Sequence, residues 1–393
     1  MIDAMDAAIA DQMIDTLARF VDHDVAPHVR EFELDDLYPD AMVDQMCAFG
    51  LFGATIPEAF GGLGLDVSTY ARVIEELSRG WMSLSGVINS HLIAAQLIHG
   101  FGTDDQRARW LPGMAAGELR GCFSLSEPDS GSDAAALRCQ ARRDGDQWIV
   151  NGTKMWVTNG ERAGIVALLV RTSDEPGAAG ISCFLVEKTP GPQGDGGITI
   201  SKHIDKLGYR GLETVEMSYV DHRIPASSLL GGEAGLGQGF RWALKALELG
   251  RINVAARGVG VAQAAFDAAL SYAQQREAFG KPIAQHQAIG FKLAEMATKL
   301  HAARLMVKDA AARVDAGERA DMEAGMAKLF ASETAAELAL DAMRIHGGNG
   351  FTTEYPVERL YRDAPLMIIG EGTSEIQKLV ISRALLSRAK KRA

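Results

Sequence analysis

Hydrophobic residues recur at helical spacing towards both ends of the chain and at strand spacing in its middle. Near the N-terminus, Met13, Leu17 and Phe20 follow one another at intervals of three or four residues, which predicts an amphipathic helix. Similar helical patterns continue through the first part of the chain. We therefore expect an N-terminal α-helical domain over residues 1–118.

The middle of the chain changes to short apolar runs separated by glycine-rich turns. Residues 165–170 read Ile-Val-Ala-Leu-Leu-Val, and Val215, Met217 and Tyr219 alternate with polar residues. Alternation with a period of two is typical of a strand that is buried on one face. This pattern predicts an antiparallel β-domain over residues 119–232.

Helical spacing returns after this segment, in longer stretches that are rich in alanine. One apolar stripe consists of Leu293, Met296, Leu300, Ala303, Val307, Ala310 and Val314. Small residues along such a stripe favour close packing of long helices, as in a four-helix bundle. The expected fold class is therefore α+β, with a C-terminal helical bundle over residues 233–393.

Composition and charge narrow the class of protein. Of the 393 residues, 47% are hydrophobic and 23% charged, as in ordinary globular proteins, and the net charge of -11 argues against a nucleic-acid partner. No apolar run approaches the length that spans a membrane, and the acidic N-terminus resembles neither a secretory signal nor a transit peptide. The four cysteines show no CxxC spacing, so we expect no disulfide framework and a cytoplasmic location.

Several common catalytic and binding motifs are absent from the sequence. We find no GxGxxG or P-loop nucleotide cradle, no GxSxG nucleophile elbow, and no His/Cys cluster with zinc spacing. The scattered His91, His222, His286 and His346 are typical of structural histidines, so we predict no metal site. A nucleotide cofactor would have to be held without a Rossmann unit.

One carboxylate near the C-terminus stands on an unusually bare backbone. Glu371 lies between Gly370 and Gly372, and the following residues 374–377 fit a helix capping box. Glycines on both sides permit a tight turn that presents the carboxylate, as a general base requires. On local sequence alone a solvated turn glutamate is the simpler interpretation, but the rest of the chain favours the base.

Five further segments are rich in small, polar and aromatic residues at fixed places. They are residues 121–133, 154–160, 205–214, 276–281 and 346–350. Together with the turn at Glu371 they resemble the acyl-CoA dehydrogenase family, in matching order and spacing over essentially the whole chain. Several motifs in register are far more specific than a single motif match.

The resemblance implies a non-covalent FAD site between the β-domain and the C-terminal helices. Trp156 and Thr158 match the aromatic and the hydroxyl beside the flavin ring, although a lone tryptophan on a strand is more often a core residue. Arg276 matches a residue that reaches the FAD of a neighbouring subunit, which implies a homotetramer. The full set of matching cofactor positions is Phe123, Leu125, Ser126, Gly131, Ser132, Trp156, Thr158, Arg276, Phe279, Gln287, Arg344, Gly347, Gly348, Thr373 and Glu375.

The resemblance also implies the reaction. Glu371 matches the base that removes the α-proton of an acyl-CoA while the β-hydrogen leaves as hydride to flavin N5, giving a trans-2-enoyl-CoA. The backbone N–H at the base position is implied to bind the thioester oxygen. Matching substrate-binding positions are Ser132, Glu248, Arg251 and Gly372. Glu248 and Arg251 also fit a helical i,i+3 ion pair, and that alternative stays open.

Three positions depart from the family pattern. Gly370 stands where many relatives have tyrosine, and Arg344 where glutamine is common. Gly250 occupies the place from which some subfamilies supply the base, so Glu371 is the remaining candidate. Glycines at 370 and 250 that face the pocket would enlarge it, and the hypothesis is a branched, cyclic, aromatic or otherwise bulky acyl group.

Three other functions compete with a dehydrogenase that passes its electrons to an electron-transferring flavoprotein. An acyl-CoA oxidase would reoxidise the flavin with oxygen, although such oxidases are usually longer than this chain. A nitroalkane oxidase fits less well, because Glu371 rather than an aspartate occupies the base position. A non-catalytic CoA- or flavin-binding protein is the alternative from another class, and the intact Glu371, Trp156 and Arg276 argue against it.

Overall fold

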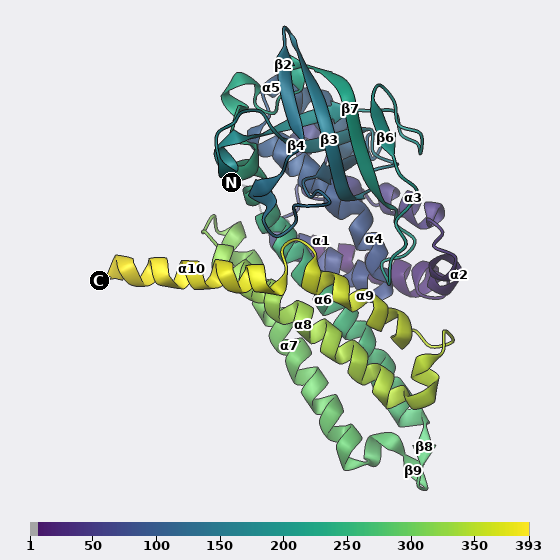
Figure 1. Ribbon diagram of the computed structural model, residues 1–393. Coiled ribbons are helices and arrows are strands. Elements are labelled where there is room, and N and C mark those ends of the chain that lie inside the picture. The colour runs from purple at the N-terminus through teal and green to yellow at the C-terminus, as the bar shows by residue number, and fades with distance from the viewer. Residues whose placement is uncertain (1–6, 393) are drawn as a thin grey trace.

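The N-terminal region is built from helices, and one of them runs through the centre of the molecule. The computed structural model describes residues 7–392 (Figure 1). The helices of this region are α1 (Ala7–Phe20), α2 (Val29–Leu34), α3 (Asp40–Ala48), α4 (Val67–Phe101) and α5 (Asp104–Ala115). The side chain of Asp66 caps α4 by accepting a hydrogen bond from Thr69 N, and the helix is broken at Trp81 (φ -156°, ψ 113°). Almost every residue of α4 beyond this break is buried, so α4 is a core helix.

The middle region is a twisted sheet with mostly antiparallel neighbours. Its strands are β1 (Gly121–Ser124), β2 (Gln140–Asp144), β3 (Gln147–Thr158), β4 (Ile165–Arg171), β5 (Ile181–Glu187), β6 (Ile198–Ile200) and β7 (Thr214–Pro225). The pairs β2–β3, β3–β7, β4–β5 and β6–β7 are antiparallel, as the sequence predicts. Strand β4 also pairs in parallel with β1 and β2, which the period-two pattern did not reveal.

Strands β4 and β5 separate two hydrophobic cores. Ile165, Ala167 and Leu169 join a core that they share with the helices of both ends of the chain. The alternate residues of β4 join a second core on the other face of the sheet, because side chains alternate along a strand. The N-terminal and C-terminal helices therefore pack as one body. The domain boundaries after residues 118 and 232 stay a prediction.

The C-terminal helices form a long bundle that points away from the sheet (Figure 1). They are α6 (Gly239–Gln275), α7 (Gln287–Asp315), α8 (Asp321–His346), α9 (Val357–Ile369) and α10 (Ser374–Arg392). The short hairpin of β8 (Glu277–Ala278) and β9 (Lys281–Pro282) lies at the far end of α6. The predicted stripe along α7 is buried from Leu293 to Ala310, and Val314 packs against its edge. Helix α10 projects sideways from the body of the chain.

The described residues contain neither a membrane-crossing helix nor a metal-holding group. Between residues 7 and 392 no helix combines the length and the hydropathy that a membrane crossing needs. The same residues contain no group of three or more His, Cys, Asp or Glu side chains that could hold a metal ion. All four cysteines are free, and three of them are buried.

Candidate active site

The turn at Glu371 joins α9 to α10 in a strained backbone conformation. Glu371 has φ +53° and Gly372 has φ +90°, and a left-handed conformation at a non-glycine residue costs about 1–3 kcal/mol. The turn is held from two sides: Lys328 Nζ donates to Gly372 O (2.8 Å) and Gln377 Nε2 donates to Glu371 O (3.3 Å). Such strain persists only where the surroundings fix it, and it is common at active sites.

The helix after the turn is capped one residue earlier than the sequence predicts. Thr373 Oγ1 accepts a hydrogen bond from Ile376 N (3.3 Å), so Thr373 rather than Ser374 is the capping residue. Ser374 instead donates its hydroxyl to Glu333 on α8 (2.7 Å). The Thr373 hydroxyl and the helix N-terminus both lower the pKa of the exposed Glu375 carboxyl.

The two carboxylate oxygens of Glu371 have different surroundings. Oε1 accepts a hydrogen bond from Asn89 Nδ2 at 2.5 Å. Oε2 is buried and has no hydrogen-bond partner. A Cβ atom on Gly250 of α6 would lie 2.0 Å from Oε2, so the carboxylate occupies the space that a side chain at 250 would need. A buried carboxylate oxygen without a partner is costly and calls for a functional explanation.

Three consecutive residues of α4, beginning with the partner of this carboxylate, each bind a different distant segment. Asn89 binds Glu371, and Ser90 Oγ donates to Thr158 O (3.4 Å) at the end of β3. Asn159, which follows Thr158, donates its amide to Ser90 Oγ (2.9 Å). Successive helical residues point about 100° apart, which is why neighbours on α4 can serve different segments. We call Glu371, Asn89, Ser90, Thr158 and Gly250 the Glu371 cluster.

The third of these residues, His91, is structural, as the sequence predicts. Its Nε2 donates to Phe52 O (3.0 Å) and its Nδ1 accepts from Gly121 N (3.0 Å), where β1 begins. Burial lowers the pKa of His91 to about 4, so the ring is neutral. The sequence analysis missed Asn89 and Ser90. Their signal is three polar residues in a row within the apolar stretch from Val87 to Ile93 of a buried helix.

Trp156 is presented to the outside by an irregularity in β3. The register of β3 against β7 shifts between Lys154 and Val157, and Trp156 has φ +61°. A β-bulge of this kind re-aims one side chain away from the regular alternation. The indole is 57% exposed, so the alternative of a core tryptophan is wrong. An exposed aromatic face beside Thr158 is suited to stacking on a flat ring.

A buried ion pair fixes the segment after β1 to the strand that carries Trp156. Lys154 is fully buried, and its Nζ donates to Glu127 Oε1 (2.8 Å) and to Leu125 O (2.9 Å). Glu127 also accepts from Arg138 N (2.7 Å), while the Arg138 side chain is exposed and pairs with Asp129 (3.7 Å). Met155 N donates to Ser126 O (2.8 Å). The predicted positions 123, 125 and 126 are therefore held, half-buried, against β3.

The structure places Gly131 and Ser132 in an exposed loop beyond this segment. Within the described residues no hydrogen bond links the Ser132 side chain to the Glu371 cluster. A ligand that contacts both must therefore extend from the interior at Glu371 to the surface of the β-domain. That shape is a long molecule with one buried end.

The predicted substrate contacts on α6 have another partner than the sequence suggests. None of the ion pairs within residues 7–392 joins Glu248 to Arg251. Burial and the nearby carboxylate of Asp321, from the start of α8, raise the pKa of Glu248 to about 7. The Nε atom of Arg251 is buried without a hydrogen-bond partner. The i,i+3 alternative is thus limited to a charge interaction without an ion-pair contact, since the Arg251 charge lowers the pKa of Glu248 against these two effects. Both residues lie within about one helical turn of Gly250.

Six predicted cofactor positions lie far from Glu371, at the other end of α6. We call them the Arg276 cluster: Arg276, Phe279, Gln287, Arg344, Gly347 and Gly348. Asn349 Nδ2 donates to Tyr272 Oη (2.9 Å) and so joins the end of α8 to the end of α6. Phe279 is 96% exposed, and Arg344 pairs with Asp341 (3.3 Å). At 1.5 Å per residue the helix separates this cluster from Gly250 by roughly 38 Å.

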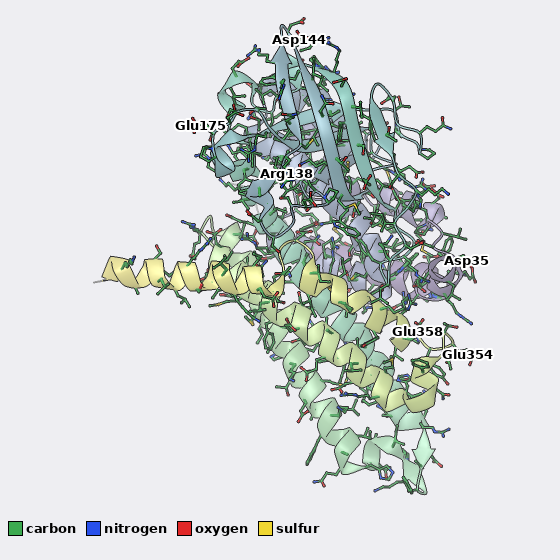
Figure 2. The ribbon with its side chains drawn as sticks, in the orientation of Figure 1. Asp35, Arg138, Asp144, Glu175, Glu354 and Glu358 are labelled. Carbon is green, nitrogen blue, oxygen red and sulfur yellow. The ribbon has the colours of Figure 1, made fainter. Side chains whose placement is uncertain are left out.

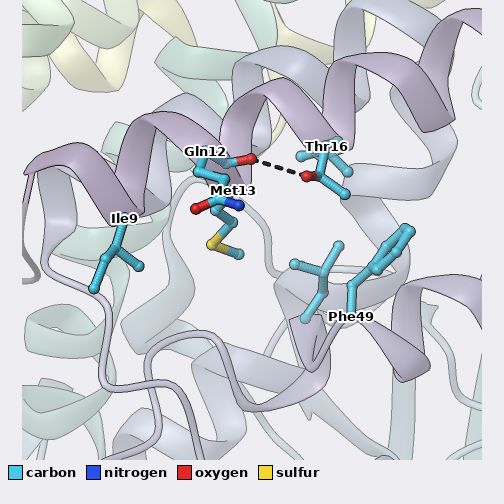
Figure 3. A pocket seen from close by; sticks show the side chains of 7 residues that line it. Ile9, Gln12, Met13, Thr16 and Phe49 are labelled. Atoms are coloured by element: carbon cyan, nitrogen blue, oxygen red, sulfur yellow. Dashed lines mark hydrogen bonds between the residues drawn. The ribbon is translucent and has the colours of Figure 1, made fainter.

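A separate hollow lies on the N-terminal helices (Figure 3). Its lining residues are Ile9, Gln12, Met13, Thr16, Leu17, Phe49 and Leu51. Thr16 donates its hydroxyl to Gln12 O (2.9 Å) at its edge. The hollow shares no residue with the Glu371 cluster or with the Arg276 cluster.

Comparison with known proteins agrees with this arrangement over the whole chain. Models of the acyl-CoA dehydrogenase N-terminal, middle and C-terminal domains match residues 9–118, 122–221 and 237–386. The (2S)-methylsuccinyl-CoA dehydrogenase of Cereibacter sphaeroides is 42% identical over 378 residues, which make up 95% of this chain and 68% of that protein.

Two solved structures extend the likeness to the fold. The butyryl-CoA dehydrogenase of Megasphaera elsdenii has a TM-score of 0.92 at 34% identity, covering 98% of this chain and 100% of that one. A glutaryl-CoA dehydrogenase of Mycobacterium smegmatis in complex with FADH2 has a TM-score of 0.89 at 30% identity, covering 97% and 95%. With all three domains matched and relatives aligned over nearly the whole chain, the chain belongs to the acyl-CoA dehydrogenase family of FAD-dependent oxidoreductases.

Proposed function

We propose that the protein oxidises an acyl-CoA to its trans-2-enoyl-CoA, with Glu371 as the catalytic base. The observation that carries this proposal is the unpartnered, buried Oε2 of Glu371 on a strained turn. Asn89 holds the other oxygen, so the carboxylate is oriented while one oxygen stays free to accept a proton. A positioned base of this kind contributes typically 10²–10⁴-fold to a rate.

In the proposed step the α C–H bond breaks and its proton goes to Glu371, the β-hydrogen leaves with its electron pair, and the α–β bond becomes double. A flavin held beside Trp156 would supply the acceptor of that hydride. The backbone N–H of Glu371 is the chain's own donor to the thioester oxygen, where negative charge develops. The left-handed φ of Glu371 sets the direction of this N–H relative to the carboxylate.

The residues around Trp156 fit a flavin. FAD would supply the hydride acceptor, and the exposed indole, the Thr158 hydroxyl and the half-buried Phe123, Leu125 and Ser126 would hold its ring. The buried ion pair between Lys154 and Glu127 holds together the two segments that form this surface.

The Arg276 cluster fits the cofactor of another copy of the chain. Its guanidinium and exposed aromatic ring suit a diphosphate and an adenine. It lies too far along α6 to reach the Trp156 surface of the same chain. This separation supports the sharing of each FAD between two copies of the chain, and the homotetramer that the sequence implies stays a prediction.

The acyl group and the electron acceptor are the least constrained parts. The relatives above act on butyryl, glutaryl and methylsuccinyl thioesters according to their names. A bulky acyl group gains no support from the glycines: a Cβ on Gly370 would face Leu366 of α9, and the space at Gly250 is filled by Glu371. An electron-transferring flavoprotein is the proposed acceptor. Oxygen consumption with acyl-CoA alone would instead favour an oxidase.

An anaerobic titration tests the proposal. Purified protein is mixed with a panel of acyl-CoAs, and bleaching of the flavin absorbance is followed. Glu371→Gln should keep its flavin and reduce the bleaching rate by about 10²–10⁴-fold. Glu354→Gln, an exposed carboxylate near α9 (Figure 2), is the matched control and should react like the wild type. A Glu371→Gln protein that bleaches at the wild-type rate would show that another group is the base.

A further inference from the structure

Arg257 of α6 is a buried cation without an anionic partner. Its side chain and backbone together are only 4% exposed. Nε donates to Asn253 Oδ1 (2.7 Å) and Nη1 donates to Tyr209 Oη (3.2 Å). Nη2 is buried and has no hydrogen-bond partner. Between residues 7 and 392 no carboxylate pairs with this guanidinium within 4.0 Å.

The other buried cations of the described chain are accommodated in ways that are not open to Arg257. Lys154 faces Glu127 at 2.8 Å. Lys188 and Lys328 donate to backbone carbonyls, and burial lowers the pKa of both ammonium groups. Arg359 is stabilised by the charge of Asp363. An arginine cannot escape its burial cost by losing a proton, and an unpaired buried charge is strongly unfavourable. The missing anion at Arg257 therefore calls for a source outside the chain.

Arg257 lies on the face of α6 that carries the catalytic carboxylate. Gly250, Asn253 and Arg257 follow at three- and four-residue intervals and so share one side of the helix. The bond from Nε to Asn253 shows that the guanidinium leans back along the helix, towards Gly250 and the Oε2 atom of Glu371. Their separation is one to two helical turns, roughly 5–10 Å.

Helix α4 lies opposite this face of α6 and contacts the partners of both Arg257 and Gly250. A Cβ on Gly86 would lie 1.7 Å from Tyr209 Oη, the hydroxyl that Arg257 binds. Asn89, one turn further along α4, binds Glu371. Glycine at 86 therefore makes room for the tyrosine beside Arg257, and α4 meets the neighbours of both the cation and the base within about one helical turn.

The side chains that surround Arg257 between α4 and α6 are polar. Asn253 Nδ2 donates to Tyr70 Oη (2.7 Å), so two tyrosine hydroxyls flank Arg257. Burial raises the pKa of Tyr70 and of Tyr209, the Arg257 charge lowers both, and the Glu371 charge raises both. Both hydroxyls thus lie within range of both charges. An apolar chain end placed here would leave these groups without partners, which is costly.

We propose that Arg257 receives a carboxylate at the far end of the acyl group, so that the substrate is the CoA thioester of a short dicarboxylic acid. This inference rests on the proposed dehydrogenation at Glu371. A guanidinium offers forked donors that match a planar carboxylate. The spacing between base and cation fits an acyl chain of four or five carbons, with the α-carbon at Glu371 and the distal carboxylate at Arg257 and Tyr209.

Two carboxylates of the chain come closest to serving as the missing partner. Asp363 accepts from Tyr209 N (2.6 Å); burial raises its pKa to about 6, and the cations that lower it are Arg359 and Arg362 rather than Arg257. Glu371 is bound to Asn89 rather than to Arg257, and as the base it must become neutral during each turnover. The counter-ion of Arg257 is therefore best supplied by the substrate while it is bound.

Binding to the Glu371→Gln protein measures the acyl preference without turnover. Glutaryl-CoA and its ω-amide have the same length and shape but differ in charge, and calorimetry gives both dissociation constants. Loss of a buried charge pair corresponds to about 30-fold or more in affinity, so the amide should bind at least that much more weakly. Equal affinity, or a preference for the amide or for butyryl-CoA, would overturn the inference.

Variants at 257 assign the preference to the guanidinium. Arg257→Gln should lower the affinity for glutaryl-CoA by about 30-fold and leave the ω-amide within threefold, while Arg257→Lys should restore part of the difference. Arg304→Gln on α7, whose partner is Glu75 (2.8 Å), is the matched control. Equal losses for both ligands would contradict a specific contact. If Arg257→Gln does not fold, the comparison of the two ligands on the parent protein decides alone.

The two proposals fail in different ways. If no acyl-CoA bleaches the flavin of the wild-type protein, the dehydrogenation at Glu371 is wrong. If unsubstituted acyl-CoAs bleach it at least tenfold faster than glutaryl-CoA and other ω-carboxyl thioesters of four or five carbons, dehydrogenation stands and the carboxylate preference is wrong.

Discussion

The Glu371 cluster reaches α6 at Gly250 and the Arg276 cluster follows the end of the same helix, but the two differ in how their polar groups are satisfied. At the Glu371 cluster, Asn89 binds the Glu371 carboxylate, and Ser90 binds Thr158 O and the Asn159 amide at the end of β3. In and around it a few buried atoms of the described residues lack partners, among them Glu371 Oε2, Arg251 Nε and Arg257 Nη2. At the Arg276 cluster the side chains stand in the open, and Phe279 is almost fully exposed.

The difference shows two ways in which a chain can indicate a missing component. A few unpaired atoms in an otherwise satisfied interior mark the place of a small ligand, because the cost of burial is paid back only when the ligand arrives. An exposed aromatic and an exposed cation on a short hairpin mark a contact with a larger body. We infer that the first cluster decides the chemistry and the second decides cofactor retention and assembly.

Gly250→Ala is expected to have the largest effect on the Glu371 cluster. The added Cβ would lie 2.0 Å from Glu371 Oε2, so the carboxylate must move by about an ångström. A misplacement of that size costs about 100-fold in rate. The measurement is the anaerobic rate of flavin bleaching, with flavin content and unfolding temperature as checks.

Gly290→Ala on α7 is the matched control, because its Cβ would meet nothing closer than 3.5 Å. It should bleach at the wild-type rate. Normal turnover by Gly250→Ala would show that the carboxylate does not need its present position, and the assignment of Oε2 as the proton acceptor would fall.

Arg276→Ala should have a smaller effect of another kind. We expect about a tenfold weaker FAD affinity and turnover that recovers when FAD is added in excess, measured by flavin release on dilution. Lys281→Ala, on the same hairpin, is the control. If the Arg276 variant keeps its flavin and loses turnover, the separation into a chemical cluster and a retention cluster is wrong.

The fold and the turn at Glu371 could be predicted from sequence because they depend on local signals, whereas the role of Glu371 as base is implied by the family resemblance and stays a prediction. Helical and strand periodicities identify the elements, and the glycines beside Glu371 identify the turn. Asn89 could not be assigned, because it meets Glu371 across 282 positions of the chain. Only the crossing of α4 with the C-terminal turn brings them together.

Contacts with neighbouring elements explain two further features that the sequence did not reveal. Thr373 and Ser374 both carry a hydroxyl suited to capping, and the choice between them was decided by Glu333 on α8, which binds Ser374. Arg257 looks in sequence like any helical arginine. Its meaning depends on the absence of a carboxylate around it, and that is visible only once the neighbouring elements are in place.

Glu248→Gln tests the smallest expected effect, the loss of stability caused by burying a carboxyl next to the Glu371 cluster. Its carboxyl has a pKa of about 7, raised by burial and by Asp321. Between pH 4.5 and 7 the folded chain therefore holds more protons than the unfolded chain, and the free energy of unfolding falls as pH rises. Glutamine cannot titrate, so the variant should lose this decline and be more stable than the wild type above pH 7. Because the side chain is partly exposed, we expect a gain of under about 1 kcal/mol, measured by urea unfolding at several pH values.

Glu277→Gln, on the exposed hairpin next to the Arg276 cluster, is the control and should follow the wild-type profile. If the Glu248 variant also followed the wild-type profile, burial of this carboxyl near the Glu371 cluster would not lower the free energy of unfolding.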